Sequence, residues 1–437
     1  MKLKLKLVNN REIKNASWII GEQVFQMVVS LILGMISARY LGPDRYGELN
    51  YTASFISFFT AIANLGMENV IIKKMIAFPD KEGEYLGSAL VYRLISSVLS
   101  GISILIIIYF LNPEEEIKLL LAALQILQLV FQAGYILDSW FQRHLKSKYV
   151  SIAKSIACVI VAAYRIYILV STKSIIWFAF TNSLTYIVVA VVLFIFYRRQ
   201  GGEALSFKWA TGNDVLKDSY HFIISGMMVA IYGQMDKIMI GKMIDDKHVG
   251  YYTTAAIICG MWTFVPNAII NSLRPGIMEH KENGNEEQYM LKLQQLYSIL
   301  IWFCLSVSAV VFIFSPLIVQ ILYGKEYLDS VPSLRILIWR EVFAILGTAR
   351  GIWLISENKN KYIKYLLFIG AVLNLILNYI LIPICGIDGA SIATLLTQIT
   401  TCVIAPLFFK GTRMHTYILL EAFTLKWYFK QKKNKSE

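Results

Sequence analysis

Charged residues are scarce in this sequence. Asp, Glu, Lys and Arg make up 16% of its 437 residues, whereas soluble globular domains carry roughly 25%. Apolar residues reach 57%, and the mean hydropathy is +0.56. This composition excludes a water-soluble fold and indicates a polytopic inner-membrane protein.

Cysteine and histidine are also few, and neither is clustered. The five cysteines lie in apolar stretches without a nearby histidine: Cys158, Cys259, Cys304, Cys385 and Cys402. A disulfide framework or a metal site needs paired or clustered ligands, so we expect neither. The net charge of +13 comes from basic residues scattered between apolar segments. That distribution argues against nucleic-acid binding, which uses a basic patch.

Long apolar runs dominate the chain, and a helix needs about 20 such residues to cross the bilayer. The first run is too long for the apolar core of a signal peptide and lacks a convincing cleavage site, so we expect a retained span. Twelve runs qualify, at about 17–38, 50–72, 86–111, 117–138, 150–170, 173–197, 217–243, 249–273, 292–322, 332–356, 361–383 and 386–409.

The loops between these runs alternate in basic charge. With the N-terminus inside, the inner loops carry about three to seven Lys or Arg each, and the outer loops carry about two or fewer. Positively charged loops remain in the cytoplasm. The alternation therefore predicts that both termini are cytoplasmic.

A weak internal repeat divides the chain. Shifting the sequence by 203 residues aligns Arg39 with Lys242 and Gly47 with Gly250. Transporters are commonly built from such duplicated bundles. We predict an all-α fold with six spans in each of two lobes around a central cavity. The predicted parts are an N-lobe (1–200), a cytoplasmic connector (201–216), a C-lobe (217–410) and a basic amphipathic cytoplasmic tail (411–437).

Several basic residues lie inside predicted spans. A charge facing lipid costs several kcal/mol, so it usually faces a cavity or a partner. We expect these residues to line a cationic cavity for an anionic group such as pyrophosphate, which arginine can bind bidentately. The alternative is that they reach an interface or form salt bridges that only join helices. The substrate-binding candidates are Arg93, Arg165, Lys237, Arg340 and Arg350.

Acidic residues also occur within the spans. A buried carboxylate can take up a proton, so these residues are candidates for coupling transport to a proton or sodium gradient. For Glu22 the alternative is a hydrated carboxylate at the cytoplasmic edge. Neighbouring residues on a helix diverge by about 100°, so we expect Arg340 and Glu341 to face different environments. We expect no resident cofactor or metal. The coupling candidates are Glu22, Asp236, Glu68 and Glu341.

Four short strings of the sequence are distinctive. They are Arg39-Tyr40-Leu41-Gly42-Pro43-Asp44-Arg45-Tyr46-Gly47, Gln234-Met235-Asp236-Lys237-Ile238-Met239-Ile240-Gly241, Leu322-Tyr323-Gly324-Lys325-Glu326-Tyr327 and Gly386-Ile387-Asp388-Gly389-Ala390-Ser391. Together they resemble the Wzx-type polysaccharide and O-antigen flippases, the oligosaccharide flippase family of the multidrug/oligosaccharidyl-lipid/polysaccharide (MOP) exporter superfamily. The resemblance covers roughly residues 10 to 410.

The resemblance implies a transporter and not an enzyme. Its substrate would be an undecaprenyl-pyrophosphate-linked oligosaccharide of O-antigen, lipopolysaccharide or capsule type, moved from the cytoplasmic to the periplasmic leaflet by alternating access. A polysaccharide polymerase and a chain-length regulator would be expected partners. Two alternatives stay open: a drug/cation antiporter of the same superfamily, and a membrane-embedded polymerase or ligase of lipid-linked sugars. The short outer loops argue against the enzyme.

Overall fold

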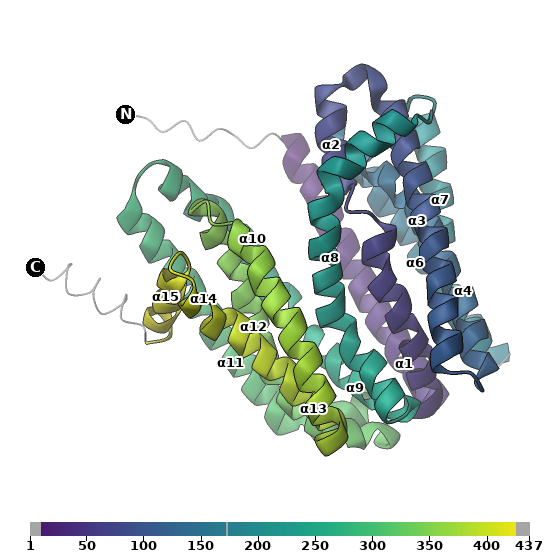
Figure 1. Ribbon diagram of the computed structural model, residues 1–437, viewed down its shortest axis with the longest axis vertical. Coiled ribbons are helices and arrows are strands. Elements are labelled where there is room, and N and C mark those ends of the chain that lie inside the picture. Colours follow the sequence, from purple (N-terminus) through teal and green to yellow (C-terminus); the bar gives the residue numbers. More distant parts are fainter. Residues whose placement is uncertain (1–9, 172–173, 425–437) are drawn as a thin grey trace, which may run out of the picture. The chain divides into compact units, whose positions relative to one another are not determined.

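The structure, a computed structural model, describes residues 10–171 and 174–424. Within these ranges every regular element is a helix (Figure 1). The chain divides into two compact units, Met1–Gln234 and Met235–Glu437. The division falls inside one helix, α8, so the lobe and connector limits predicted from the sequence stay predictions.

The first unit is a bundle of long helices. In it α1 packs against α3, α4 and α6, and α7 packs against α4 and α6. Its helices are α1 (Asn10–Ala63), α2 (Glu68–Ala77), the 3-10 turn η1 (Pro79–Lys81), α3 (Glu82–Leu111), α4 (Glu116–Gln132), the 3-10 turn η2 (Ala133–Leu137), α5 (Asp138–Arg143), α6 (Ser147–Ser171), α7 (Ile175–Arg199) and the larger part of α8 (Trp209–Met243).

Helix α1 contains a break at Gly42. The φ of Gly42 is 72° and its ψ is 169°, a conformation open to glycine and hardly to other residues. Pro43 follows, which has no N–H for the helical ladder. The break separates the first two predicted spans. The predicted end of the second span at residue 72 is wrong, because α1 ends at Ala63 and Leu65 enters a turn with a φ of 52°.

The second unit is organised around α12, which packs against α9, α11 and α13. Its helices after the end of α8 are α9 (Asp246–Gly260), α10 (Phe264–Glu282), α11 (Glu286–Leu322), the 3-10 turn η3 (Lys325–Ser330), α12 (Val331–Ser356), α13 (Lys361–Ile399), the π-helical turn η4 (Thr400–Ile404), α14 (Ala405–Phe408) and α15 (Arg413–Phe423). The predicted span at 249–273 is interrupted between α9 and α10.

Helix α13 folds back on itself at Gly386. The φ of this residue is 60° and its ψ is −139°, so the segment is two helical halves joined by a tight turn. A methyl group added at Gly389 would lie 2.1 Å from the carbonyl oxygen of Leu381, which leaves no room for a larger residue. The two halves carry the eleventh and twelfth predicted spans, and side chains on them can therefore meet.

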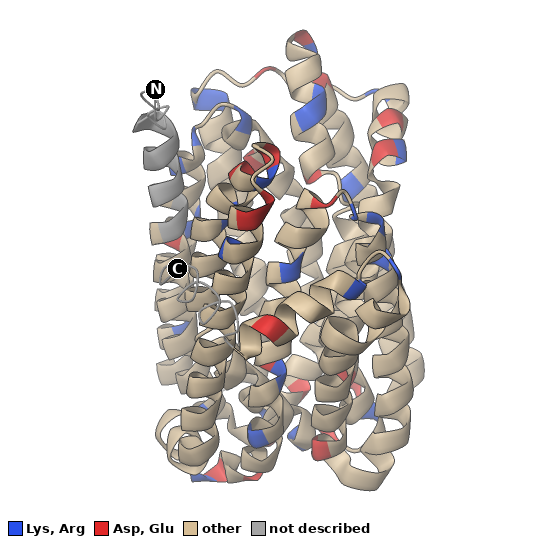
Figure 2. Ribbon diagram, turned by 90° about the vertical axis from the view of Figure 1, so that its left-hand side faces the viewer, with Lys and Arg blue, Asp and Glu red and all other residues tan. Residues whose placement is uncertain are grey.

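Nine segments of the described chain are long and apolar enough to cross a bilayer. Two of them, Gly21–Ala77 and Lys361–Phe408, each contain two of the predicted spans. The tenth predicted span corresponds to α12. This helix is not among the nine segments, because it contains four charged residues. In the described chain each of the twelve predicted spans thus overlaps one or more helices, and those at 50–72 and 249–273 are interrupted by turns. Figure 2 shows long helical stretches without charge, with many of the Lys, Arg, Asp and Glu residues near helix ends and in turns.

Helix α15 belongs to the predicted tail and packs against α11. Ser298 donates to the carbonyl oxygen of Ala422 at 2.7 Å, and the rings of Trp302 and Phe423 are stacked. One face of this segment therefore packs within the protein, while the apolar side chains of Met414, Tyr417 and Leu420 are exposed. The remainder of the predicted tail, residues 425–437, lies outside the described residues.

One buried histidine makes this packing sensitive to pH. His415 on α15 is fully buried beside the rings of Tyr297 and Trp353, and its Nε2 lies 3.1 Å from the Tyr297 hydroxyl. Burial, together with the nearby Arg350, holds the pKa of His415 well below its ordinary value of 6.5. The neutral imidazole is therefore the form compatible with the fold.

We expect the His415 contribution to stability to be complete above pH 6.5 and to be lost as the pH falls below it, because the unfolded chain then binds a proton that the folded chain does not. The limiting slope is about 1.4 kcal/mol per pH unit. Thermal unfolding of purified protein at pH 7.5 and 5.5 measures this. A His415→Phe variant keeps the ring and should lose less stability on acidification than the wild type. An equal loss in both proteins would contradict the prediction.

Candidate functional site

The structure sorts the predicted membrane cations by their partners, beginning with Arg93. This residue on α3 is fully buried. Its guanidinium donates to the Asn64 side-chain oxygen and lies 3.7 Å from the Glu68 carboxylate. Arg93 was predicted to bind substrate and Glu68 to couple transport to an ion. The structure brings the two together as an ion pair at the junction of α1 and α2.

Arg340 and Glu341 on α12 also pair with one another. The Nε and Nη2 atoms of Arg340 each lie 2.9 Å from a Glu341 carboxylate oxygen. The expectation that these neighbours face different environments is wrong. The arginine side chain is long enough to fold back along the helix, and the carboxylate is buried and otherwise uncompensated.

Arg350 lies further along α12, and its side chain is bound by a backbone carbonyl group. Its Nη1 donates to the carbonyl oxygen of Thr401 at 2.5 Å. Thr401 belongs to the π-helical turn η4, where the regular ladder of helical hydrogen bonds is altered. Arg350 therefore joins α12 to the end of the last predicted span.

Arg165 on α6 and Lys237 on α8 differ from the other three cations. Within the described residues neither makes an ion pair or a hydrogen bond, and the Nε atom of Arg165 is buried without a partner. Lys237 interacts electrostatically with Asp236 and Arg340. These two are therefore the predicted cations for which neither an ion pair nor a hydrogen bond is found in the described chain, although Asp236 acts on Lys237 electrostatically.

Asp236 lies at the centre of a buried polar cluster in the second unit. Its carboxylate accepts hydrogen bonds from the Tyr252 hydroxyl on α9, from Asn378 at 2.6 Å and from Thr394 at 2.7 Å. Asn378 also donates to Asn374 at 3.1 Å. The turn at Gly386 creates the cluster, because Asn378 and Thr394 come from the two halves of α13.

The donors around Asp236 are all uncharged, and one acceptor in the cluster is unused. The side-chain oxygen of Asn378 is buried and has no hydrogen-bond partner in the described chain. A carboxylate, amide oxygens and a hydroxyl are the oxygen ligands that hard cations prefer. These residues fit a proton or a small monovalent cation. No group of three His, Cys, Asp or Glu that could hold a metal is found in the described part of the chain.

The sequence identified Asp236 and missed its partners. Asn374 and Asn378 stand four residues apart in an otherwise apolar run, which places both amides on one face of a helix. That spacing was the available signal. Nothing in the sequence connects them to Tyr252 or Thr394, because that proximity depends on how α8, α9 and the halves of α13 pack.

Glu22 on α1 is the remaining coupling candidate. Its side chain is buried, and the charged groups that act on it are Lys154 and Asp138. Glu22 therefore belongs to a mixed-charge cluster of the first unit. The expectation that it couples transport to an ion stays a prediction.

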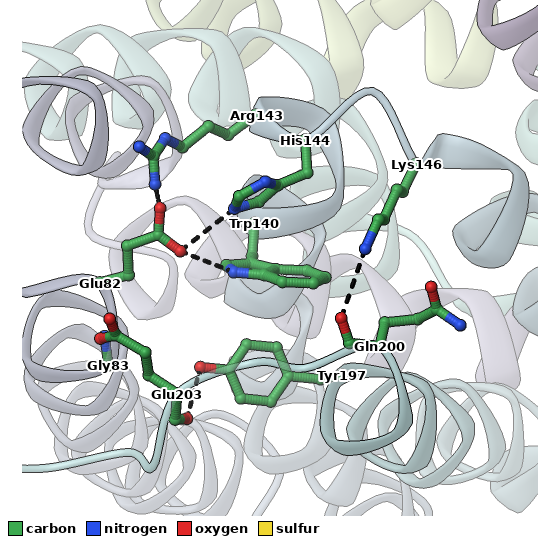
Figure 3. A network of polar contacts seen from close by, with 9 residues as sticks. All are labelled: Glu82, Gly83, Trp140, Arg143, His144, Lys146, Tyr197, Gln200 and Glu203. Atoms are coloured by element: carbon green, nitrogen blue, oxygen red, sulfur yellow. Dashed lines mark hydrogen bonds and ion pairs between the residues drawn. The ribbon is translucent and has the colours of Figure 1, made fainter. Parts of the chain in front are cut away.

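A second polar network, shown in Figure 3, is centred on the buried carboxylate of Glu82 at the start of α3. It accepts from the Trp140 indole at 2.8 Å, pairs with Arg143 and lies 3.2 Å from Nε2 of His144. Burial, with Arg143 and Lys146 nearby, holds the pKa of His144 below 6.5. The network joins α3 to α5 and the turn after it.

The segment between α7 and α8 is hydrogen-bonded to the same part of the unit, at the start of α3. The Gly83 N–H donates to the Glu203 carboxylate at 2.7 Å, and the Tyr197 hydroxyl donates to the Glu203 carbonyl at 2.8 Å (Figure 3). Further along, the Lys208 N–H donates to the Ser88 hydroxyl at 3.0 Å. A methyl group at Gly87 would lie 2.3 Å from the Ser206 carbonyl oxygen. This segment therefore lies directly on the first turns of α3.

Comparison with solved structures defines the class of protein. The chain resembles a lipid II flippase MurJ in an inward closed conformation, with a TM-score of 0.73 and 14% identity over 94% of this chain and 92% of that one. It also resembles an inward-facing MATE-family multidrug transporter of the MOP superfamily, with a TM-score of 0.67 and 14% identity over 91% and 96% of the two chains. The fold is that of a MATE- and MurJ-like multi-span membrane protein, as predicted.

Comparison of sequences then defines the family. A family model described as polysaccharide biosynthesis protein matches residues 13–280, and the MatE model matches residues 222–380. A probable low-salt glycan biosynthesis flippase of Haloferax volcanii is 24% identical over 90% of this chain and 80% of its own length. Lipid II flippase MurJ of Bacillus subtilis is 23% identical over 53% of this chain and 46% of its own length.

The chain therefore belongs to the polysaccharide biosynthesis protein family, within the MOP superfamily of membrane transporters. This confirms the resemblance found in the sequence. Membership of this family also decides between the two classes of protein considered above: the chain is a transporter and not a membrane-embedded polymerase or ligase.

Proposed function

We propose that this protein is a flippase that moves a lipid-linked glycan across the membrane. Family membership supports the glycan, and the flippase activity of the relatives supports the transport step. The observation that carries the proposal is that two cations inside apolar membrane segments, Arg165 and Lys237, make no ion pair or hydrogen bond in the described chain. An anionic cargo explains why such costly residues are present.

The more detailed proposal rests on the family resemblance and the loop charges of the sequence. The cargo is an undecaprenyl-pyrophosphate-linked repeat unit of O-antigen or capsule type, moved from the cytoplasmic to the periplasmic leaflet of the inner membrane, with both termini cytoplasmic. Among the five predicted cations, Arg165 and Lys237 are proposed to contact the cargo, and Arg93, Arg340 and Arg350 to hold helices in place. A polysaccharide polymerase and a chain-length regulator are the proposed partners.

The coupling step is assigned to Asp236. Uptake of a proton or a sodium ion there would neutralise a carboxylate that joins α8, α9 and both halves of α13. A charge that appears and disappears in a buried site changes the relative stability of two packings of the same helices, which is what alternating access requires. Glu22 is a second candidate in the first unit.

One observation favours a second function, a drug/cation antiporter. The MatE model matches residues 222–380, a range that includes Asp236. An antiporter of cationic drugs would need acidic residues facing its cargo, whereas the charged groups that make no ion pair or hydrogen bond in the described chain include the cations Arg165 and Lys237. This function ranks below the flippase for that reason.

Deletion of the gene, followed by analysis of lipid-linked intermediates, tests the flippase. We expect one lipid-linked repeat unit to accumulate on the cytoplasmic leaflet, because synthesis continues while translocation stops. Restoration by the wild-type gene is the control. Unchanged intermediates together with increased drug sensitivity would replace the flippase by the antiporter, and accumulation of lipid II would assign a peptidoglycan precursor as the cargo.

A further inference from the structure

Two adjoining cavities lie inside the first unit, between α1, α4, α6 and α7. Their volumes are about 290 Å³ and 130 Å³. Both are lined by Arg165 and Asn182, so these two residues stand where the cavities meet. Asn182 and Ser30 are exposed side chains, which makes the larger cavity accessible from outside the unit.

Arg165 is the only Lys or Arg among the lining residues of these cavities. Its guanidinium has five N–H donors and stays charged at any pH that the protein meets. In the described structure its electrostatic neighbours are Tyr46 and Cys158, both uncharged in their ordinary form, and no carboxylate pairs with it. A ligand in the cavity would therefore find one full positive charge and a planar set of donors.

A single guanidinium limits the charge of the ligand. One carboxylate satisfies it with two parallel N–H···O bonds, and the site then becomes neutral. A pyrophosphate brings two or more negative charges into a place where only one cation can offset them, and the excess charge would remain buried at high cost. The charge balance therefore favours a monoanion.

The remaining walls suit a ring that carries hydroxyl groups. Asn182, Gln128 and Gln26 line the larger cavity, and each amide can both donate and accept hydrogen bonds. Tyr135 and Tyr186 lie on the same wall with their ring centroids 5.5 Å apart. Such rings offer apolar faces to the C–H side of a sugar while the amides bind its hydroxyls.

The acidic residues nearest to this wall are partly offset by a lysine. Glu22 and Asp138 act electrostatically on Tyr135, and Lys154 acts on both carboxylates. The Nζ atom of Lys154 lies 5.6 Å from the centre of the Tyr135 ring. None of these three side chains is among the lining residues of the two cavities, so the charge on the lining itself is the positive charge of Arg165.

We propose that this cavity binds an acidic sugar residue of the glycan, with the sugar carboxylate on Arg165 and its hydroxyls on Asn182 and Gln128. The inference rests on the proposed function, since it assumes a glycan cargo, and it names the class of sugar that the cargo contains. A hexuronic acid is the simplest member of that class. The pyrophosphate of the cargo is not assigned to Arg165.

The test is binding of free glucuronate to the purified full-length protein, measured by thermal shift and by calorimetry, with glucose and inorganic pyrophosphate as comparison ligands. We expect the wild type to bind glucuronate at least 10-fold more tightly than glucose. The Arg165→Gln variant should lose roughly 10- to 100-fold in affinity for glucuronate, the usual effect of removing a hydrogen-bonded charge. Arg165→Lys should lie between the two.

Arg335→Gln, on α12 of the second unit, is the matched control, because Arg335 is bonded to Ser315 and lies outside this pocket. It should bind glucuronate as the wild type does. Asn182→Ala provides a second pocket variant should Arg165→Gln fold poorly, and its affinity for both sugars should fall. The proposal is overturned if the wild type does not distinguish glucuronate from glucose, if Arg165→Gln binds glucuronate normally, or if pyrophosphate displaces glucuronate in an Arg165-dependent way.

These outcomes are separate from a failure of the proposed function. Unchanged lipid-linked intermediates after gene deletion would remove the flippase and leave the glucuronate binding standing as a measurement. Conversely, a confirmed flippase whose protein ignores glucuronate would keep its function and lose the acidic-sugar pocket.

Discussion

Replacing Asp236 by asparagine is expected to slow gradient-driven transport by roughly 100-fold, which corresponds to about 2.7 kcal/mol. Asparagine has nearly the same shape and can bond with Tyr252, Asn378 and Thr394. It can neither take up a proton nor attract a cation. The ion gradient would then lose its effect on the packing of α8, α9 and α13.

The same substitution is expected to leave the stability of the folded protein close to that of the wild type. The hydrogen bonds of Asp236 come from uncharged groups, so none of its hydrogen-bond partners becomes a buried charge without a counter-ion, and the charge interaction that is lost is the one with the partly buried Lys237. Loss of transport together with unchanged thermal stability is the combination that separates a coupling role from a structural one.

The measurement is flipping of a fluorescent lipid-linked glycan in proteoliposomes, with sodium and proton gradients imposed separately. Asp388→Asn is the control, because Asp388 lies on the same helix α13 as two of the Asp236 partners but accepts its hydrogen bond from Ser333, at 2.6 Å, and not from the cluster. It should transport normally. A full gradient-driven rate in Asp236→Asn would remove Asp236 from the coupling step.

The Glu82→Gln variant is expected to unfold more easily by roughly 3 kcal/mol, the lower end of the range for breaking a buried ion pair. Glu82 is 6% exposed and Arg143 is 15% exposed on its side chain, so the guanidinium would remain largely buried without a counter-charge. The amide nitrogen of glutamine would also face the donors of Trp140 and His144.

Thermal unfolding followed by tryptophan fluorescence tests this, and Trp140 reports on the network itself. Glu84→Gln is the matched control two residues along α3. Its main partner Lys208 has a side chain that is 62% exposed, so that pair should contribute about 1 kcal/mol or less. If the two variants unfolded at the same temperature, the Glu82 network would not be a principal contributor to the stability of the first unit.

Much of the fold can be predicted from the sequence, because each membrane-spanning helix is recognisable from the composition of its own segment. A run of about 20 apolar residues can satisfy its backbone only as a helix in lipid. In the described chain the twelve predicted spans therefore overlap helices. The errors lie where helices break, at the end of α1 and between α9 and α10, since a turn such as Asn64–Met67 depends on local backbone conformation more than on hydropathy.

The candidate site was predicted only in part. A charge in an apolar run marks Arg93, Arg165 and Asp236 as unusual. In the structure Arg93 and Asp236 have polar partners, and Arg165 lines two cavities. The sequence pattern does not predict the partners of these residues. Arg93 pairs with Glu68, and Arg340 with Glu341, whereas Arg165 has no such partner in the described chain.

The sequence by itself determined that this protein is an all-helical membrane protein with charges inside its spans, because hydropathy acts on each segment alone, and its resemblance to a family indicated a transporter. Only the tertiary structure decided which of those charges are neutralised. The decision depends on atoms far apart in the chain, such as Asp236 and Thr394, which meet because α13 turns back at Gly386. An electrostatic interaction depends on distance, and distance is a property of the packed helices.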